Sequence, residues 1–391
     1  MSENITLLIE KFVPPGQGLG FYRNKAVFVP LTLPGDLVEI GIEKEKKRHI
    51  IGRLERVLRP GPRRREAPCP HYRDCGGCDL LHLDYADQLE MKLAVLKEVL
   101  AGFGIEPGFP LLLQPAAKEG AGGRHRARFH YDPESGFFGF KPRRRHRVVR
   151  IGNCRALAPG LKKLYALLDR GVDIPLSTTA IQGLAAAAGD FAAALVWGRK
   201  FGPLVGVPET VVENYGFGKL ELAASGFAQV NPEITGYLLA DLISTCPPAT
   251  EVAELYGGSG TFTLALAARR RKVTVYESDH RAVARARRNL AATGEGKVSL
   301  ICGRVEGKKL PATVTTIVVD PPRAGLAPVV RRQILESRAA RLFYVSCNPA
   351  TLARDLGTFL SEANGFRLDS LKAYDMYPGT THLELLAQLS R

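Results

Sequence analysis

Residues 251–279 read EVAELYGGSGTFTLALAARRRKVTVYESD, and this stretch decides the fold. An apolar run at 251–255 leads into a glycine-rich turn, an amphipathic segment at 261–270 and a second apolar run at 272–277. Short apolar runs beside glycine are typical of buried strands, and the spacing of apolar residues between the two runs is that of a helix. The stretch is therefore predicted to be a strand–turn–helix–strand unit, the building block of a parallel sheet.

Toward the C-terminus the same alternation of apolar runs and amphipathic segments continues. Strands are predicted at 298–302, 314–320, 342–347, 366–374 and 383–389, and helices at 279–292, 327–338 and 350–363. Alternating strands and helices predict a parallel sheet with helices on both faces. No helix separates the last two strands, so we expect them to form an antiparallel hairpin.

The N-terminal half of the sequence indicates further domains. A chain of 391 residues is typical of two or three domains. Residues 1–58 alternate short apolar runs with glycine and proline, which predicts a small β-barrel. Residues 59–224 mix strand and helix patterns. We expect their helix at 85–103 to pack on the C-terminal domain, residues 225–391.

The charge of the chain indicates a polyanionic partner. Lysine and arginine number 54 against 39 aspartates and glutamates, a net charge of +15, and nucleic acid is the commonest partner of so basic a protein. Residues 124–150 hold nine basic and two acidic residues, together with the rings of Phe129, Tyr131, Phe137, Phe138 and Phe140. This stretch is either a solvated basic hairpin or an RNA-facing strand pair whose rings stack on bases, and we favour the second interpretation.

The sequence lacks the patterns of membrane and exported proteins. No stretch approaches about 18 consecutive apolar residues, and the N-terminus Met1-Ser2-Glu3-Asn4 does not begin a secretory signal. Seven cysteines in such a chain indicate metal-binding or catalytic thiols rather than disulfides. We therefore expect a cytoplasmic protein that does not contact a membrane.

The glycine-rich turn at 257–260 predicts a nucleotide-like ligand, although a turn of purely structural purpose is the alternative. Glycine lets a backbone turn tightly and approach a ligand closely. Glu277 ends the next strand, 20 residues after Gly257, where an acid can accept the hydroxyls of a ribose. Because the turn is not G-x-G-x-x-G, an adenosyl group without a pyrophosphate fits better. S-adenosylmethionine is the expected cofactor.

Three further residues mark a reaction centre. Asp320 ends the fourth predicted strand and Cys347 the fifth, and ligands of such sheets bind beyond the carboxyl ends of the strands. Cys347 lies directly before a helix, whose N-terminus is expected to lower the pKa of the thiol. Glu384 interrupts an otherwise apolar strand. It is either a solvent-facing residue of an edge strand or a base near the thiol.

A thiol, a carboxylate and a methyl donor form a working set for methylating uracil. Carbon 5 of uracil is a poor nucleophile, and addition of a thiolate at carbon 6 makes an enolate that can attack a methyl group. A base must then remove the proton from carbon 5 so that the thiol can leave. Amino methyltransferases need no such thiol and typically carry an aromatic residue after D-P-P, where this chain has Arg323.

Four motifs resemble those of the RNA (uracil-5-)-methyltransferase family, and the resemblance covers essentially the whole chain. They are Phe227-Ala228-Gln229-Val230-Asn231, Asp320-Pro321-Pro322-Arg323, Ser346-Cys347-Asn348-Pro349 and His382-Leu383-Glu384. The resemblance implies an α/β fold with a Rossmann-like class I methyltransferase domain. The family's glycine loop commonly reads D-L-F-C-G-x-G, and this chain departs from it at Glu254 and Gly257.

The same resemblance implies roles for individual residues. Cys347 would be the catalytic nucleophile, and Glu384 the base that removes the proton. Gln229, Tyr256, Glu277 and Asp320 would bind the cofactor. Phe227 would stack on an extruded base and Arg323 would contact the substrate. RNA 5-methylcytosine enzymes are similar but carry a cysteine in the region of Arg323, so the arginine favours uracil.

Four cysteines form a candidate metal site, namely Cys69, Cys75, Cys78 and Cys154. Their spacing is typical of structural zinc and of an iron–sulfur cluster alike. The run CPHYRDCGGC at 69–78 resembles the iron–sulfur box of the ribosomal-RNA branch of the family, which implies a [4Fe–4S] cluster in a central α+β domain. Cys246 and Cys302 have no partner by spacing and are expected to be buried thiols.

The N-terminal barrel resembles a TRAM domain, an OB-like RNA-binding module. Barrel and cluster together imply 23S ribosomal RNA as the substrate. Transfer RNA is one alternative, and an RNA-binding or assembly protein without catalysis is another. We expect a monomer that needs no protein partner.

Overall fold

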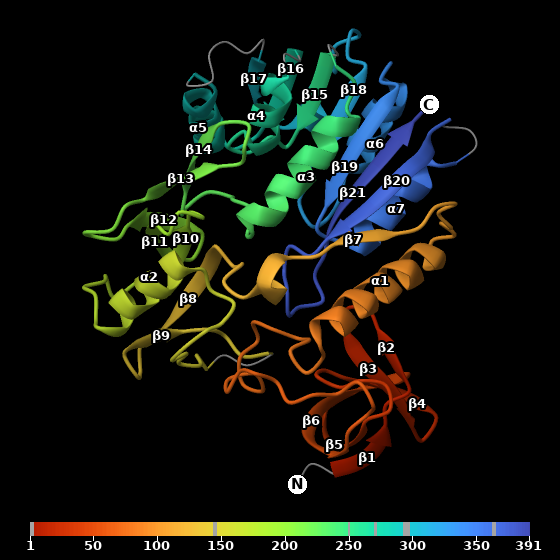
Figure 1. Cartoon of the computed structure of the whole chain (residues 1–391), viewed down its shortest axis with the longest axis vertical. Coiled ribbons are helices and arrows are strands. Elements are labelled where there is room, and N and C mark those ends of the chain that lie inside the picture. The colour runs from red at the N-terminus through yellow and green to blue at the C-terminus, as the bar shows by residue number, and fades with distance from the viewer. Residues whose placement is uncertain (1–3, 144–146, 249–250, 270–271, 292–297, 362–364) are drawn as a thin grey trace.

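A mixed sheet forms the C-terminal part of the molecule. The computed structural model describes residues 4–143, 147–248, 251–269, 272–291, 298–361 and 365–391. Within them, eight strands join this sheet in the order β17-β16-β15-β18-β19-β21-β20-β7 (Figure 1). The strands are β7 Leu112–Gln114, β15 Glu251–Leu255, β16 Lys272–Glu277, β17 Val298–Cys302, β18 Thr316–Val319, β19 Arg341–Ser346, β20 Arg367–Tyr374 and β21 Glu384–Ser390.

The direction of the strands changes within this sheet. Strands β17, β16, β15, β18 and β19 are parallel to one another. Strand β21 is antiparallel to both of its neighbours, β19 and β20, which confirms the predicted terminal hairpin. Strand β7 pairs parallel with β20 at the sheet edge and was not predicted. β21 therefore lies inside the sheet, between β19 and β20.

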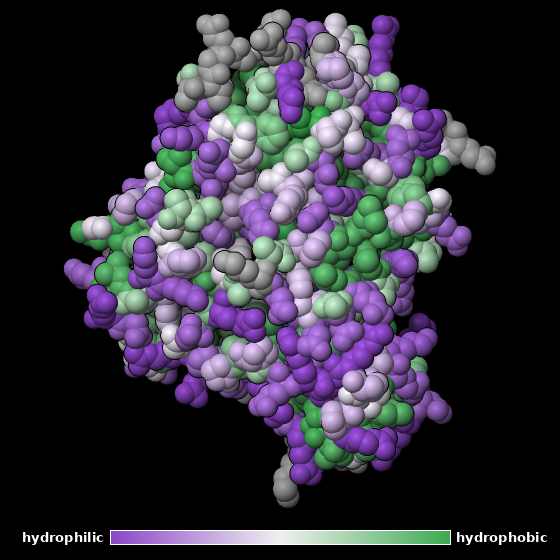
Figure 2. Space-filling view, viewed as in Figure 1, coloured by the Kyte–Doolittle hydropathy of each residue, from purple (hydrophilic) through white to green (hydrophobic). Residues whose placement is uncertain are grey.

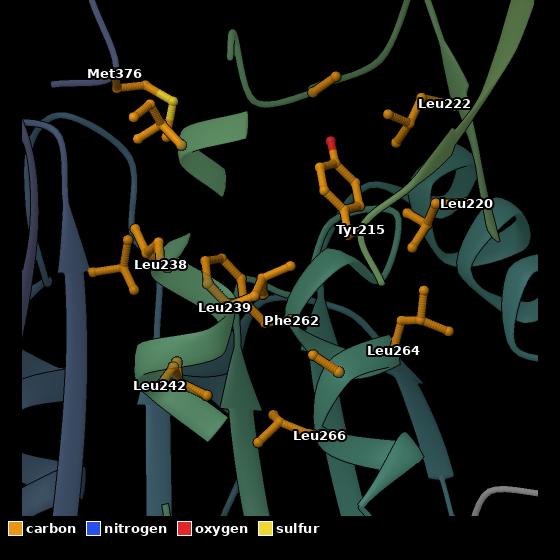
Figure 3. Close-up of a cluster of buried hydrophobic side chains, with 14 of the residues drawn as sticks. Tyr215, Leu220, Leu222, Leu238, Leu239, Leu242, Phe262, Leu264, Leu266 and Met376 are labelled. Carbon is orange, nitrogen blue, oxygen red and sulfur yellow. The ribbon is translucent and has the colours of Figure 1, made fainter. Parts of the chain in front are cut away.

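Helices cover both faces of the sheet, as the alternating pattern predicts. One face packs against α3 Pro232–Thr245 and α4 Thr261–Ala268, with Leu239 and Phe262 in the buried cluster of Figure 3. The other face packs against α1 Tyr85–Gly102, α6 Pro328–Glu336 and α7 Pro349–Phe359. Helix α5, His280–Ala291, lies beside β16 and β17. The predicted ends of three helices, at 270, 292 and 362–363, fall outside the described residues.

A separate sheet forms the N-terminal part. Its strands follow the order β1-β5-β6-β4-β3-β2, and the sheet curls below α1 in Figure 1. They are β1 Asn4–Leu8, β2 Lys11–Val13, β3 Gln17–Tyr22, β4 Lys25–Val29, β5 Leu37–Glu45 and β6 His49–Arg59. Alternating residues of β1, such as Ile5 and Leu7, point into its own hydrophobic core.

Residues between these two parts form a third sheet, of order β12-β11-β10-β8-β9, covered by α2, Pro159–Asp169. The strands are β8 Arg126–Asp132, β9 Phe137–Gly139, β10 Ala180–Ala185, β11 Phe191–Trp197 and β12 Lys200–Pro203. A further strand pair, β13 Thr210–Asn214 and β14 Lys219–Ala223, contributes Leu220 and Leu222 to the cluster in Figure 3. The short 3-10 helices are Ala117–Gly120 and Val305–Gly307.

The visible surface is mainly hydrophilic, with hydrophobic residues in scattered patches (Figure 2). In the part of the chain that the structure describes, each helix is too short or too polar to cross a membrane.

Candidate active site

One cavity of about 740 Å³ opens beyond the carboxyl ends of β15, β16, β18 and β19. The residues that the sequence predicts for catalysis, cofactor and substrate all line it: Phe227, Gln229, Tyr256, Glu277, Asp320, Arg323, Cys347 and Glu384. They come from the ends of separate strands and from the segment before α3. The sheet therefore brings together residues that are up to 157 positions apart (227 to 384).

The glycine-rich turn after β15 folds back tightly against β16. Tyr256 adopts a left-handed backbone with φ of 66°, which is uncommon outside glycine. The backbone N–H of Tyr256 donates to the carbonyl of Tyr276 at 2.8 Å. At Gly257 a Cβ atom would lie 2.3 Å from Cγ1 of Val275. The loop as folded therefore has no room for the cysteine that the family commonly carries there.

Glu277 ties this turn to the end of β16. Its carboxylate accepts hydrogen bonds from the backbone N–H of Gly258 at 2.9 Å and of Asp279 at 2.7 Å. A carboxylate offers about four acceptor positions. The hydroxyl of Ser278 donates to the same carboxylate at 3.3 Å, so Glu277 can hold the loop and still accept a hydroxyl group from a ligand in the cavity.

Cys347 directly follows β19, and Glu384 is the first residue of β21, so the two lie side by side. In the β19–β21 ladder the last pair is Ser346 with Leu385, so the next residues in each direction are Cys347 and Glu384. Glu384 is only 3% exposed and its strand lies inside the sheet. The alternative of a solvent-facing residue on an edge strand is therefore wrong.

The electrostatics of the cavity differ from the expectation for Cys347. Burial, and then the negative charge of Glu384, raise the pKa of the Cys347 thiol to about 11, although Arg323 acts in the opposite direction. The expected lowering by the helix N-terminus is thus outweighed. Burial raises the pKa of Asp320 to about 7. Burial, together with nearby Asp320, also raises the pKa of Glu384 well above its ordinary value.

These shifts describe a cavity that disfavours additional negative charge. Three acidic groups, Asp320, Cys347 and Glu384, face one buried space. A ligand with a positive charge would favour their ionised forms, since an opposite charge nearby stabilises the charged state of an acid. The cavity is therefore suited to a cationic ligand.

Helix α7 holds the loop that carries Arg323. The side chains of Asn348 and Thr351 donate to the backbone carbonyl of Arg323, at 3.0 and 3.3 Å. Buried Asp355 accepts from the backbone N–H of Leu326 at 2.8 Å. The same helix that follows Cys347 thus fixes the segment after Asp320.

Tyr377 also lines the cavity, and the sequence reasoning missed it. It lies between β20 and β21, and its ring packs edge-on against His382 at 5.8 Å. Nδ1 of His382 lies 3.2 Å from Nη2 of Arg323. An aromatic residue in the short segment between two apolar strands, next to the H-L-E motif, was the available signal.

The four candidate metal-binding cysteines, Cys69, Cys75, Cys78 and Cys154, line a second, small cavity. Burial, with a smaller contribution from the neighbouring thiols of Cys154 and Cys75, raises the pKa of Cys78 to about 11, although the positive charge of Arg124 acts in the opposite direction. Among the described residues, no group of three or more His, Cys, Asp or Glu is arranged to hold a single metal ion. The described residues include all seven cysteines, and none of them forms a disulfide.

The two cysteines without a predicted partner differ in burial. Cys246 is buried, as expected. Cys302 is exposed, so the prediction of a buried thiol is wrong there. The reason is its place at the end of β17, the outermost strand of the sheet.

The basic stretch at 124–150 is a hairpin of β8 and β9, but its rings do not all face solvent. Phe129 and Phe138 are buried in the core beneath α2, so the hypothesis that they stack on RNA is wrong. Strand alternation puts the arginines of β8 on the other face. Arg126 and Arg128, with Arg124, line a groove of about 310 Å³ beside Tyr377. Residues 144–146 of this stretch lie outside the described residues.

Comparison with known proteins finds relatives over nearly the whole chain. The family model described as tRNA (Uracil-5-)-methyltransferase matches residues 219–391. The chain is 30% identical to the 23S rRNA (uracil(1939)-C(5))-methyltransferase RlmD of Vibrio parahaemolyticus, over 97% of this chain and 94% of that protein. It is 31% identical to the protein of the same name from Halomonas elongata, over 98% and 89%.

A solved structure shares the fold over nearly the whole chain. It is that of Pyrococcus abyssi tRNA (uracil-54, C5)-methyltransferase in complex with S-adenosyl-L-homocysteine. The TM-score is 0.76 at 23% identity, with 98% of this chain and 100% of that chain covered. This likeness identifies the sheet around the cavity as an α/β methyltransferase fold. By its sequence relatives and its fold, the chain belongs to the RNA (uracil-5-)-methyltransferase family.

Proposed function

We propose that this protein transfers a methyl group from S-adenosylmethionine to carbon 5 of a uridine in 23S ribosomal RNA. The observation that carries the proposal is the pairing of β19 with β21, since it brings Cys347 and Glu384 into one cavity with Asp320. Family membership supports the reaction, and the relatives named for 23S rRNA support the substrate. A protein that methylates this RNA works in the cytoplasm.

The chemistry assigned to the chain uses a temporary covalent bond to the base. The thiolate of Cys347 adds to carbon 6 of uracil, and the resulting enolate makes carbon 5 nucleophilic. Carbon 5 would then take up the methyl group, while the electron pair of the broken methyl–sulfur bond stays on the cofactor's sulfur, which loses its positive charge. After carbon 5 has been methylated, Glu384 accepts its proton, the double bond between carbons 5 and 6 re-forms, and the bond from carbon 6 to sulfur breaks. The electron pair of that bond returns to Cys347.

Four residues are proposed to hold the cofactor: Gln229, Tyr256, Glu277 and Asp320. When bound, S-adenosylmethionine supplies a methyl group attached to a positively charged sulfur. The acidic cavity suits that charge, and the free acceptor position of Glu277 suits a ribose hydroxyl. A cationic ligand beside Asp320 and Glu384 would also lower their raised pKa values and so prepare Glu384 to accept a proton.

Phe227 and Arg323 are proposed to bind the RNA. Phe227 is 66% exposed although it lines the cavity, so its ring can stack on a base that leaves the RNA helix. The positive charge of Arg323 lowers the pKa of Cys347 and thus favours the nucleophilic thiolate. The arginine-lined groove beside Tyr377 can follow the RNA backbone.

A [4Fe–4S] cluster is proposed for the four cysteines at the second cavity. One cavity brings the four thiols together, although Cys154 lies far from the other three in the sequence. This gathering, together with the resemblance of the run at 69–78 to the iron–sulfur box of the ribosomal-RNA branch, supports the cluster, which would supply a rigid covalent anchor for the cysteine loop.

The domain assignments are also part of the proposal. We assign residues 1–58 to a TRAM-like RNA-binding barrel, 59–224 to the cluster domain and 225–391 to the methyltransferase domain. The six-stranded N-terminal sheet with its own core supports the first assignment. A monomer would contain every element that the proposal uses.

Transfer of a labelled methyl group tests the function. The purified protein is incubated with methyl-labelled S-adenosylmethionine and either unmodified 23S rRNA or unmodified tRNA, and the modified nucleoside is identified by mass spectrometry. We expect 5-methyluridine in 23S rRNA and no labelling with Cys347→Ala.

Other results would revise or overturn the proposal. Labelling of tRNA alone would mean that tRNA is the substrate, and this is the second candidate because the matching family model is that of tRNA (Uracil-5-)-methyltransferases. Binding of RNA without transfer to either RNA would indicate a non-catalytic assembly protein.

A further inference from the structure

The segment of residues 375–383 links β20 to β21, and Glu384 follows it directly. It contributes Tyr377 to the active-site cavity and carries His382, the neighbour of Arg323. Tyr374, before the segment, pairs with Glu384, after it, across the β20–β21 ladder. The conformation of this segment therefore decides where Glu384 and Tyr377 lie relative to Cys347.

A buried lysine of α1, far away in the sequence, forms hydrogen bonds near both ends of the segment. Nζ of Lys92, on α1, donates to Oδ1 of Asp375 at 2.5 Å, to the carbonyl of Tyr377 at 3.1 Å and to the carbonyl of His382 at 3.2 Å. An ammonium group has three donors, so all three are used within this one segment. His382 lies two residues before Glu384.

Other side chains on the same face of α1 contact the same segment. The hydroxyl of Tyr85 donates to Oδ2 of Asp375 at 2.7 Å. Oε1 of Gln88 accepts from the backbone N–H of Gly379 at 3.1 Å. Residues 85, 88 and 92 are spaced so that they share one helix face. Helix α1 thus contacts the segment through a row of polar side chains, and Lys92 is the charged residue among them.

Stability alone gives little reason for a lysine at this place. Lys92 is 2% exposed and Asp375 is fully buried. Burying such a pair removes two charges from water, and apolar residues of similar size are often as stable or more so. The ion pair instead fixes a conformation, because the hydrogen bonds of Lys92 specify one arrangement of the backbone around Tyr377 and His382.

We propose that Lys92 is a positioning residue for Glu384, so that α1 sets the geometry of the proton-removal step from outside the catalytic sheet. In Figure 1, α1 lies between the N-terminal sheet and the methyltransferase sheet. The inference rests on the proposed function, in which Glu384 releases the covalent intermediate. It does not make Lys92 a catalytic residue, since its bonds are to Asp375 and to backbone carbonyls.

The partition between covalent adduct and finished product tests this inference. The variant Lys92→Met keeps the length of the side chain and removes its donors. We expect the ratio of RNA–protein adduct to 5-methyluridine to rise about tenfold to a hundredfold, as for a group displaced by about 1 Å. The affinity for S-adenosylmethionine, measured by calorimetry, should stay unchanged. Lys97→Met, at an exposed position of the same helix, is the matched control.

A merely structural role would give a different result. Loss of folded protein lowers adduct and product in parallel, so a wild-type ratio in Lys92→Met overturns the inference. If Lys92→Met melts below the assay temperature, the double variant Lys92→Met/Asp375→Asn carries the test, because it leaves no unpaired buried charge. Absence of 5-methyluridine from the wild-type protein would instead overturn the proposed function.

Discussion

Ser346 of β19 pairs with Leu385 of β21, and this one backbone pair sets Cys347 beside Glu384. Nucleophile and base thus owe their relative position to strand register and not to a shared loop. A slip of one residue would turn Glu384 toward the opposite face of the sheet. The segment held by Lys92 leads directly into β21 and so helps to keep this register.

The first prediction concerns release of the product. In Glu384→Gln the thiolate can still add to uracil, but the proton on carbon 5 has no acceptor. We expect turnover to fall about 10²–10⁴-fold and RNA to remain attached to the protein on a denaturing gel. Glu336→Gln, at an exposed position of α6, should behave like the wild type. A variant that turns over without adduct would show that another group is the base.

The second prediction concerns the reactivity of Cys347. Because Arg323 lowers the pKa of this thiol and Glu384 raises it, Arg323→Gln should raise that pKa and Glu384→Gln should lower it. At a fixed pH that lies below about 11 and is high enough to ionise Glu384, alkylation of Cys347 by iodoacetamide should therefore slow in the first variant and quicken in the second. A pKa change of one unit alters the rate about tenfold. Mass spectrometry of the Cys347 peptide measures it, and rates moving in the same direction would contradict the interpretation.

The third prediction concerns stability and pH. Burial raises the pKa of Glu254 to about 8 from an ordinary value of 4.5. The folded chain then keeps a proton that the unfolded chain releases, so the free energy of unfolding falls as pH rises from about 5 to 8. Glu254→Gln removes this ionisation, while an amide oxygen can still accept from Thr263. Its free energy of unfolding, measured by denaturant titration, should fall less over that range than that of the wild type, by an amount on the order of a few kcal/mol.

Exposed Glu106 supplies the control for this measurement. Glu106→Gln should keep the full wild-type dependence on pH. Asp320 and Glu384 also have raised pKa values, so part of the slope should persist in Glu254→Gln. Equal slopes in all three proteins would mean that Glu254 does not titrate in this range.

The fourth prediction concerns the cysteine cavity. Protein purified without oxygen should be brown and contain iron and acid-labile sulfide. Cys78→Ser should lose most of both, whereas Cys302→Ser, at an exposed position outside the cavity, should lose neither. Colourless wild-type protein with one bound zinc ion would replace the cluster by a structural zinc site.

Sequence patterns predict the catalytic sheet well because its strands are short, buried and bounded by glycine or charge. Strands β15, β16 and β17 have the predicted bounds. Strand β7 was missed because its three residues become a strand only by pairing with β20, more than 250 positions later. A strand that forms through hydrogen bonds to a distant partner does not need the local alternation of apolar and polar residues by which strands are predicted.

The site was predictable to the extent that strand ends define it. Asp320, Cys347 and Glu277 follow from the rule that ligands bind at the carboxyl ends of parallel strands. Lys92 could not be found in this way, because its partner Asp375 lies 283 positions away on a loop. The rings of the basic hairpin were misplaced because composition does not say which face of a strand a residue occupies, and Phe129 occupies the core face.

The place of β21 inside its sheet has a consequence for biosynthesis. Strands β19 and β20 do not pair with each other, since residues 384–390 lie between them. A ribosome that has translated only as far as β20 has made the nucleophile but not the strand that joins the two halves of the sheet. The nascent chain therefore completes the proposed active site only after the codons for β21 have been read, and a product truncated before them lacks Glu384, the base that the proposed mechanism needs to release an attached RNA.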